Sequence, residues 1–158
     1  MNENNITPFY EKDHDELDSY LKTYQEKKRT DFPRAKEFFK RFKFGLQRHI
    51  VWEEEILFPV FEDKTGMRDV GPTAVMRQEH VLIKEALEKL HQKVRMGDPE
   101  TDKEEAELLN VLGAHNEKEE NILYPAIDEM ATEEEKKEVF EKMKLVPEEK
   151  YMGCGCGH

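Results

Sequence analysis

The 158-residue sequence lacks the features on which disulfide-linked, membrane-spanning and nucleic-acid-binding proteins depend. Its only two cysteines are Cys154 and Cys156, so no disulfide framework is expected, and a reducing, cytoplasmic location is favoured. No stretch approaches the ~18 continuous apolar residues of a membrane helix, and the N-terminus does not read as a secretory signal. Basic residues are outnumbered, 25 Lys and Arg against 36 Asp and Glu, and a net charge of −11 argues against nucleic acid as a partner.

Charged residues make up 39% of the chain and hydrophobic residues 37%, a balance typical of amphipathic helices with one apolar stripe each. Apolar residues at helical spacing predict long helices over about residues 7–29, 31–59, 72–96 and 101–128. Thr7 is a candidate N-cap of the first helix, and Pro59 and Pro125 are expected to kink or end the second and fourth. We therefore predict an all-α, up-down-up-down four-helix bundle.

A shorter fifth helix is predicted over residues 132–144, because Thr132 and Glu135 have the spacing of a capping box. The predicted domain covers residues 1–147, and residues 148–158 are predicted to form a flexible tail. That tail holds Cys154, Cys156 and His158, separated by glycines. These three donors either bind a soft metal such as zinc, copper or ferrous iron, act as a thiol pair, or belong to a passive tail.

One phrase occurs twice in the chain. Residues 49–63 read HIVWEEEILFPVFED and residues 115–129 read HNEKEENILYPAIDE, 66 positions later. The same offset separates His14, in DHDEL, from His80, in EHVLI. Two copies of one helical hairpin, related by a pseudo-two-fold axis, are therefore expected.

The repeated histidines and glutamates have the spacing of a metal site. His49 and Glu53 are four residues apart, as are His115 and Glu119, so each pair shares one helix face. An unpaired carboxylate on an apolar face is unfavourable, which favours ligands over isolated core residues. The candidate metal ligands are His14, His49, Glu53, His80, His115 and Glu119. Nitrogen and oxygen donors of this kind suit iron or manganese better than zinc.

Two divalent ions would bring four positive charges, of which the two glutamates offset two. A bridging oxide or hydroxide is therefore expected to supply further negative charge. Glu54 and Glu120 also recur in both copies, and they are expected either to orient ligand histidines or to be solvated.

Other residues near these positions have a structural interpretation. Tyr10 lies one turn before His14, where the second copy has Met76. Tyr10 offers a phenolate or a hydrogen bond to a bridging oxygen, but core packing is favoured. His91 lies about 16 Å along its helix from His80 and is predicted to be a core histidine. Core packing is also predicted for Phe38, Phe42, Trp52, Phe58 and Tyr124.

Together, these motifs resemble the hemerythrin-like, or HHE cation-binding, family over about residues 8–130. The resemblance rests on DHDEL, His49-x3-Glu53 before ILFP, Glu79-His80, and His115-x3-Glu119 before ILYP. It implies a four-helix bundle with a non-haem di-iron centre. One iron would be bound by His14 and His49 and the other by His80 and His115, and both glutamates would bridge.

The sequence differs from the oxygen-carrying hemerythrins at two places. It has Met76 where those proteins place a further histidine, and His115-x3-Glu119 where they use a longer His-x4-Asp spacing. These differences argue against reversible oxygen storage. Members with six ligands are similar to sensors or redox proteins, so the resemblance implies a protein that binds or senses oxygen, nitric oxide, peroxide or iron. A second hypothesis is a redox enzyme with an electron donor, such as a peroxidase, an oxidase or a repair protein for iron–sulfur centres. A third is a structural bundle without metal.

Overall fold

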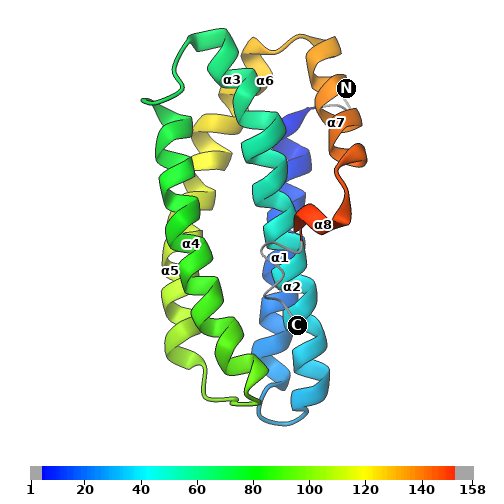
Figure 1. Ribbon diagram of the computed structural model, residues 1–158, viewed down its shortest axis with the longest axis vertical. Coiled ribbons are helices and arrows are strands. Elements are labelled where there is room, and N and C mark those ends of the chain that lie inside the picture. The colour runs from blue at the N-terminus through cyan, green and yellow to red at the C-terminus, as the bar shows by residue number, and fades with distance from the viewer. Residues whose placement is uncertain (1–4, 152–158) are drawn as a thin grey trace.

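The computed structural model describes residues 5–151. Every regular element in that range is a helix, and two long helical hairpins lie side by side (Figure 1). The first consists of α1 (Ile6–Lys27) and α2 (Phe32–Trp52), and the second of α4 (Pro72–Arg95) and α5 (Asp102–Lys118). The predicted all-α bundle is confirmed. None of the helices in residues 5–151 is long and apolar enough to cross a membrane.

Each hairpin's second helix continues through a single π-helical turn. The turn η1 (Glu53–Leu57) joins α2 to α3 (Phe58–Thr65), and η2 (Glu119–Leu123) joins α5 to α6 (Tyr124–Met130). Helical structure therefore passes through Pro59 and Pro125 and does not end there. Pro59 has no N–H to offer the Glu54 carbonyl five residues earlier, and the Arg77 guanidinium donates to that carbonyl instead, at 3.1 Å.

The π turns change which side chains face the core. Helical spacing from His115 and Glu119 predicts that Ile122 faces inward, but Ile122 is 59% exposed and Leu123 is buried in its place. A π turn holds more residues than an α turn, so the inward position moves one residue along the chain. The counterpart Ile56 is buried because α7 (Glu133–Leu145) packs against η1.

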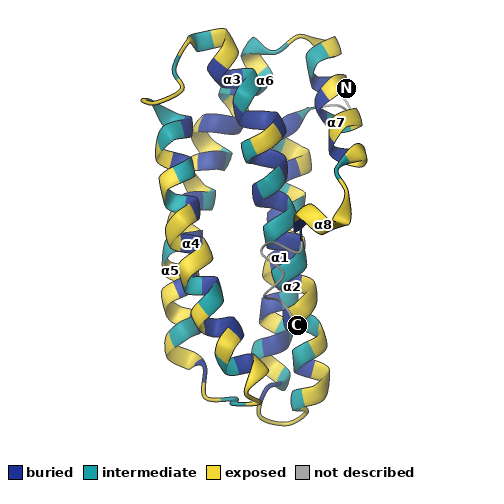
Figure 2. Cartoon of the chain, in the orientation of Figure 1, coloured by how far each residue is buried: buried dark blue, intermediate teal, exposed yellow. Residues whose placement is uncertain are grey.

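The remaining inward stripes agree with prediction except at Phe38, which is half-buried while Phe39 takes the core position. Buried positions recur along the inner sides of the long helices (Figure 2). They also recur at the 66-residue offset. Such pairs are Tyr10 and Met76, His14 and His80, Leu17 and Ile83, Leu21 and Leu87, and Leu46 and Leu112. This repetition is what the predicted pseudo-two-fold relation requires.

A buried ion pair joins the two hairpins at the end opposite the π turns. Lys28 and Glu105 are each only 3% exposed, and the Lys28 ammonium donates to Glu105 Oε2 at 2.5 Å. Lys28 also contacts Asp102 and lies 3.4 Å from Thr101 Oγ1. Burial would lower the pKa of Lys28, but its hydrogen bonds to Asp102 and Glu105 raise it above the usual value.

The C-terminal helices lie along one side of the first hairpin, where α7 packs against η1 (Figure 1). Helix α7 begins with the predicted capping box, in which Thr132 and Glu135 exchange hydrogen bonds. The structure places the start of the predicted tail in a short helix, α8 (Glu148–Tyr151). Tyr151 is buried because its ring packs on Phe44 and its hydroxyl accepts from Trp52 Nε1 at 2.9 Å.

The first turn of α1 is capped by a residue from the other end of the chain. Helix α1 begins at Ile6, one residue before the predicted start, so Thr7 is not its N-cap. The Asp128 carboxylate in α6 accepts from the backbone N–H groups of Ile6 (2.6 Å) and Thr7 (2.9 Å) and from the Thr7 hydroxyl (2.6 Å). This side chain therefore supplies the acceptors that the first turn of a helix leaves unmatched.

The Asp128→Ala variant is expected to lose about 1 kcal/mol of unfolding free energy, the usual contribution of a helix cap. For a chain of this size that is a fall of roughly 2–4 °C in melting temperature. Thermal unfolding followed by circular dichroism measures it, with the exposed neighbour Glu129→Ala as the control. Equal melting temperatures for the two variants would show that the cap contributes nothing.

Candidate metal centre

The predicted ligands converge between the four long helices, at the level where α2 and α5 pass into their π turns. His14 lies in α1, His80 in α4, and His49 and His115 near the ends of α2 and α5. Glu53 and Glu119 are the first residues of η1 and η2, and all six side chains are buried. Their donor atoms form two groups, within each of which the atoms lie within 4.8 Å of one another. The first group is Glu53, His80, His115 and Glu119, and the second is His14, His49 and Glu119.

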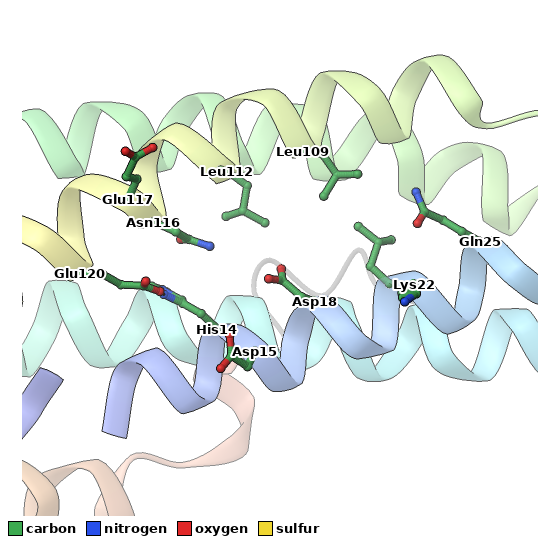
Figure 3. A pocket seen from close by; sticks show the side chains of 12 residues that line it. His14, Asp15, Asp18, Lys22, Gln25, Leu109, Leu112, Asn116, Glu117 and Glu120 are labelled. Atoms are coloured by element: carbon green, nitrogen blue, oxygen red, sulfur yellow. The ribbon is translucent and has the colours of Figure 1, made fainter. Parts of the chain in front are cut away.

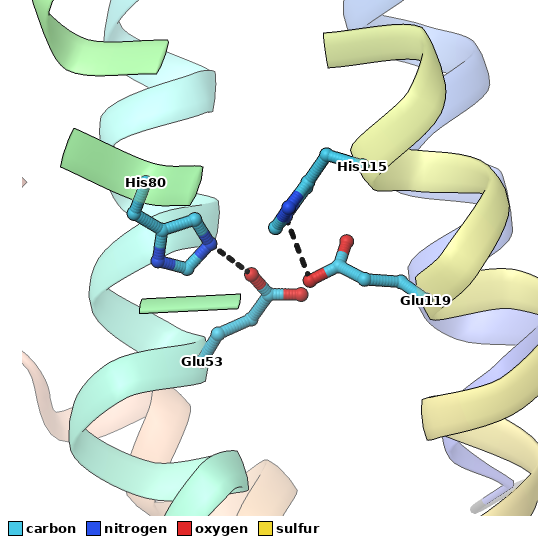
Figure 4. Close-up of side chains that lie close together, drawn as sticks. All are labelled: Glu53, His80, His115 and Glu119. Carbon is cyan, nitrogen blue, oxygen red and sulfur yellow. Dashed lines mark hydrogen bonds and ion pairs between the residues drawn. The ribbon is translucent and has the colours of Figure 1, made fainter. Parts of the chain in front are cut away.

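Each glutamate extends between the two histidine pairs. Glu53 Oε1 lies 3.0 Å from His80 Nε2, while Oε2 lies 3.2 Å from His49 Nε2. Glu119 repeats this arrangement, with Oε1 3.2 Å from His14 Nε2 and Oε2 3.1 Å from His115 Nε2. Figure 4 shows the half of this arrangement formed by the two glutamates with His80 and His115. Every carboxylate oxygen in the centre therefore faces a different imidazole.

The outer nitrogen of each imidazole is held by another carboxylate. The Nδ1 atoms pair with Glu120 on His14 (2.7 Å), Asp13 on His49 (2.8 Å), Glu54 on His80 (2.7 Å) and Glu79 on His115 (2.9 Å). With their Nδ1 atoms held in this way, the four rings turn Nε2 toward the centre, as metal-binding histidines do. Of the two roles expected for Glu54 and Glu120, the structure shows the first, because each of them orients a candidate ligand histidine.

The orienting roles of Asp13 and Glu79 were not predicted, although both residues lie in the motifs on which the family resemblance rests. A signal was present, because each directly precedes a candidate ligand and they are 66 positions apart. However, each bonds the histidine of the other helix of its hairpin, and adjacency in sequence does not reveal that partner.

Tyr124 was predicted to be a core residue, and its ring is indeed fully buried, but its hydroxyl lies inside the centre. The hydroxyl oxygen is 2.5 Å from Glu53 Oε2 and 2.8 Å from Glu119 Oε1, and 3.1 Å from His49 Nε2. The counterpart 66 positions earlier is Phe58, which stacks on His80 with ring centroids 5.6 Å apart. The Phe/Tyr difference between the two motifs was the available signal, and it makes the centre asymmetric.

Tyr10 packs beside the centre, as favoured from the sequence. Its hydroxyl donates to Met143 Sδ at 3.4 Å, and its ring lies against that of His49 with centroids 5.1 Å apart. Met76, at the equivalent position before His80, is buried in the same apolar cluster.

The electrostatics of the centre favour positive charge. Burial would lower the pKa of His49, but Glu53 and the hydrogen bond with Asp13 raise it to about 10. Burial likewise opposes protonation of His80, and Glu53 and Glu54 raise its pKa to about 9. Burial would raise the pKa of Glu53, yet the neighbouring His49 and the hydrogen bonds it accepts hold it well below the usual value. A site that holds protons this strongly also attracts metal cations.

The charge balance differs from the one inferred from the sequence. Six carboxylates surround the four imidazoles. They are Glu53 and Glu119 in the centre and the outer Asp13, Glu54, Glu79 and Glu120. Two of these outer carboxylates also face basic side chains, since Glu79 contacts Lys118 and Asp13 lies 3.8 Å from Arg48. The bridging oxide or hydroxide stays a prediction.

The donor set fits a cation in two further respects. Nε2 of His14 and Nε2 of His49 lie 3.1 Å apart, and two imidazole lone pairs at that distance repel unless a proton or a metal ion lies between them. Glu119 Oε2 is buried and lacks a hydrogen bond of good geometry, although His115 Nε2 is 3.1 Å away. A buried carboxylate oxygen without a donor is unfavourable, and a cation would satisfy it.

Comparison with known proteins agrees with this geometry. Residues 5–127 match the family described as the hemerythrin HHE cation binding domain. The chain belongs to the hemerythrin family. An uncharacterized hemerythrin-like protein of Schizosaccharomyces pombe is 32% identical over 125 residues, which cover 78% of this chain and 60% of that protein. The chain thus spans about 60% of the length of this relative. No solved structure matches.

The sequence also indicated one histidine and three tail residues outside the site. His91 is buried, bonds Glu88 at 3.3 Å and stacks on Phe39, so it is the core histidine that the sequence predicted. Cys154, Cys156 and His158 lie outside the described residues.

Proposed function

We propose that this hemerythrin-family chain holds two iron ions between its long helices and binds or senses a small molecule there. The small molecule is oxygen, nitric oxide or peroxide, or the signal is iron itself. One observation carries the proposal: Glu53 and Glu119 each turn one oxygen to the His14/His49 pair and the other to the His80/His115 pair. A carboxylate in that position is suited to bridge two cations.

In this proposal His14 and His49 bind one iron, and His80 and His115 bind the other. Glu53 and Glu119 would complete four protein donors for the His80/His115 ion, and Glu119 would complete three for the His14/His49 ion, with Glu53 Oε2 beside His49. Both sets are smaller than an octahedral set. Iron held in this way supplies one-electron chemistry and an open position for a small ligand. The outer carboxylates keep the imidazoles oriented, so these side chains need to move little when the ions bind.

A redox enzyme on the same centre is the second candidate, and the Tyr124 hydroxyl favours it. Burial and the nearby Glu119 and Glu53 carboxylates raise the pKa of Tyr124 well above its usual value, so the phenol keeps its proton. A protonated hydroxyl inside the centre can hydrogen-bond to a reduced oxygen species and position a proton for it. In this reading an electron donor is the required partner.

Metal content and optical spectra of the protein purified from its own host, under air and under reductant, test the first candidate. Two irons per chain, with a spectrum that changes on exposure to oxygen or nitric oxide, support it. Sustained consumption of peroxide or oxygen with a reductant supports the enzyme instead, because a binding protein saturates and does not turn over.

Adding ferrous iron to metal-free protein is expected to raise its melting temperature. An ion present at 1,000 times its dissociation constant stabilises the native state by about 4 kcal/mol. For a chain of this length that is a rise of roughly 8–16 °C for one ion. Anaerobic thermal unfolding with and without iron measures it. A structural bundle that binds no metal would show the same melting temperature in both.

A further inference from the structure

One pocket of the molecule borders the metal centre. It has a volume of about 370 Å³ and lies between α1 and α5, with His14 and Glu120 at one end and Gln25 and Leu109 toward the other (Figure 3). The wall on the α5 side contains Gly113, where an added Cβ would meet no atom within 4 Å. The absence of a side chain at this position therefore keeps the pocket open.

The imidazole of His14 separates this pocket from the centre. Its Nδ1 bonds Glu120, which lines the pocket, at 2.7 Å. Its Nε2 lies 3.1 Å from His49 Nε2 and 3.2 Å from Glu119 Oε1, inside the centre. A solute in the pocket is therefore one ring away from the candidate ligands.

The lining of the pocket favours cations. The lining contains four carboxylates and one lysine. The carboxylates are Asp15, Asp18, Glu117 and Glu120, and the lysine is Lys22. Apart from His14, the polar side chains in the lining are exposed or half-buried. They can attract a cation by their field without desolvating and retaining it.

The internal repeat supplies a comparison within the same molecule. At the offset of 66, the lining positions correspond to residues of α2, η1 and α4 beside His80. At these positions Asp15 corresponds to Val81, Asp18 to Lys84, Gly113 to Gln47, Asn116 to Ile50 and Glu117 to Val51. The equivalent positions on that side contain two carboxylates, Glu54 and Glu88, and two lysines, Lys43 and Lys84. The two faces share the ligands and the core, but only the α1–α5 face combines a small residue with an excess of carboxylates.

We propose that a divalent metal cation reaches the centre through the α1–α5 pocket, past the His14–Glu120 pair. The proposal rests on the proposed function, because it assumes that the centre takes up metal. It adds a direction to that function: loading occurs from the His14/His49 side and not from the His80/His115 side.

Filling the pocket is the first test. Gly113 lies inside α5 with no left-handed backbone, so Gly113→Leu is compatible with the helix and improves its propensity. Metal-free protein is mixed anaerobically with ferrous iron, and a ferrous chelator removes unbound iron at timed intervals. We expect Gly113→Leu to load several-fold more slowly than the wild type and to reach the same final iron content. Gln47→Leu, the same side chain at the equivalent position of the other hairpin, is the control and is expected to load at the wild-type rate.

Neutralising the lining is the second test. Asp18→Asn combined with Glu117→Gln is expected to slow loading roughly tenfold at low salt, and the difference should shrink as salt is added. Glu26→Gln combined with Glu107→Gln removes the same charge from exposed positions of the same two helices outside the pocket. That control is expected to keep nearly the wild-type rate.

The possible failures are distinguishable. If wild-type protein takes up no iron, the proposed function is wrong. If wild-type protein loads two irons and both pocket variants load at the wild-type rate, the centre stands and the route is wrong. Slowing of Gln47→Leu as strongly as of Gly113→Leu would also overturn the route, because it would show no preference for the α1–α5 face.

Discussion

Replacing Glu53 by alanine is expected to remove most of the metal-binding capacity of this chain. Glu53 is completely buried, and its two oxygens face His80 and His49, one from each histidine pair. Without it, both ions would lose one oxygen ligand and the negative charge that they share. Iron content is expected to fall from two per chain to one or fewer, and most of the iron-induced rise in melting temperature is expected to disappear. Elemental analysis and anaerobic thermal unfolding measure the two effects.

Two further variants isolate the role of the Glu53 charge. Glu53→Gln keeps the volume and one oxygen, so a loss of iron in this variant cannot be attributed to a cavity. The double variant Lys28→Met with Glu105→Leu removes a carboxylate that is almost as inaccessible, together with its cation, at the far end of the bundle, and it is expected to keep two irons. Two irons and an unchanged absorption spectrum in Glu53→Ala would exclude a bridging role for this residue.

Replacing Lys28 by methionine is expected to destabilise the fold strongly without affecting metal. The change leaves the buried Glu105 carboxylate without its cation, and only Thr101 and Gln25 still donate to it. Removing one member of a buried ion pair typically costs about 3–5 kcal/mol. Chemical denaturation of the metal-free protein measures this loss.

The double variant Lys28→Met with Glu105→Leu tests whether charge or packing is responsible. Its expected loss is well below that of Lys28→Met, because no buried charge is left unpaired. The equivalent positions 66 residues away already hold an uncharged pair, since Lys28 corresponds to Val94 and Glu105 to Phe39, both of which are buried and apolar. Equal losses in the single and double variants would mean that side-chain packing, and not the unpaired carboxylate, determines the stability.

The two predictions are independent because the two buried clusters are far apart. Lys28 is 14 residues after His14 on one helical segment, which is about 21 Å along the axis at 1.5 Å per residue. Variants at this distance with no shared partners generally act additively. One end of the bundle is thus expected to determine metal binding, and the other contributes mainly to stability.

Much of the site could be predicted because its information is local. His49 and Glu53 share a helix face through their spacing alone, and the same holds for His115 and Glu119. The repeat at 66 positions then paired the remaining histidines, and all six residues do converge in the structure. The helices themselves follow from apolar residues at helical spacing, which is why most predicted bounds are close to those observed, although helical structure continues past Pro59 to Thr65.

The residues that the sequence did not reveal depend on contacts between helices. Asp13 precedes His14 but bonds His49, and Glu79 precedes His80 but bonds His115. Tyr124 occupies a position that any aromatic residue could fill, and only the convergence of η1 and η2 places its hydroxyl between two carboxylates. No spacing rule along one helix identifies such partners.

The sequence by itself determined the class of fold, the pairing of its two halves and the six candidate donors, because helical periodicity and an internal repeat are properties of the chain. The tertiary structure decided how the donors are used. It turned each glutamate toward both histidine pairs, gave every imidazole an outer carboxylate, and placed a pocket beside His14, between α1 and α5. The physical reason is that orientation and access depend on how neighbouring helices pack, and spacing along one helix does not specify that packing.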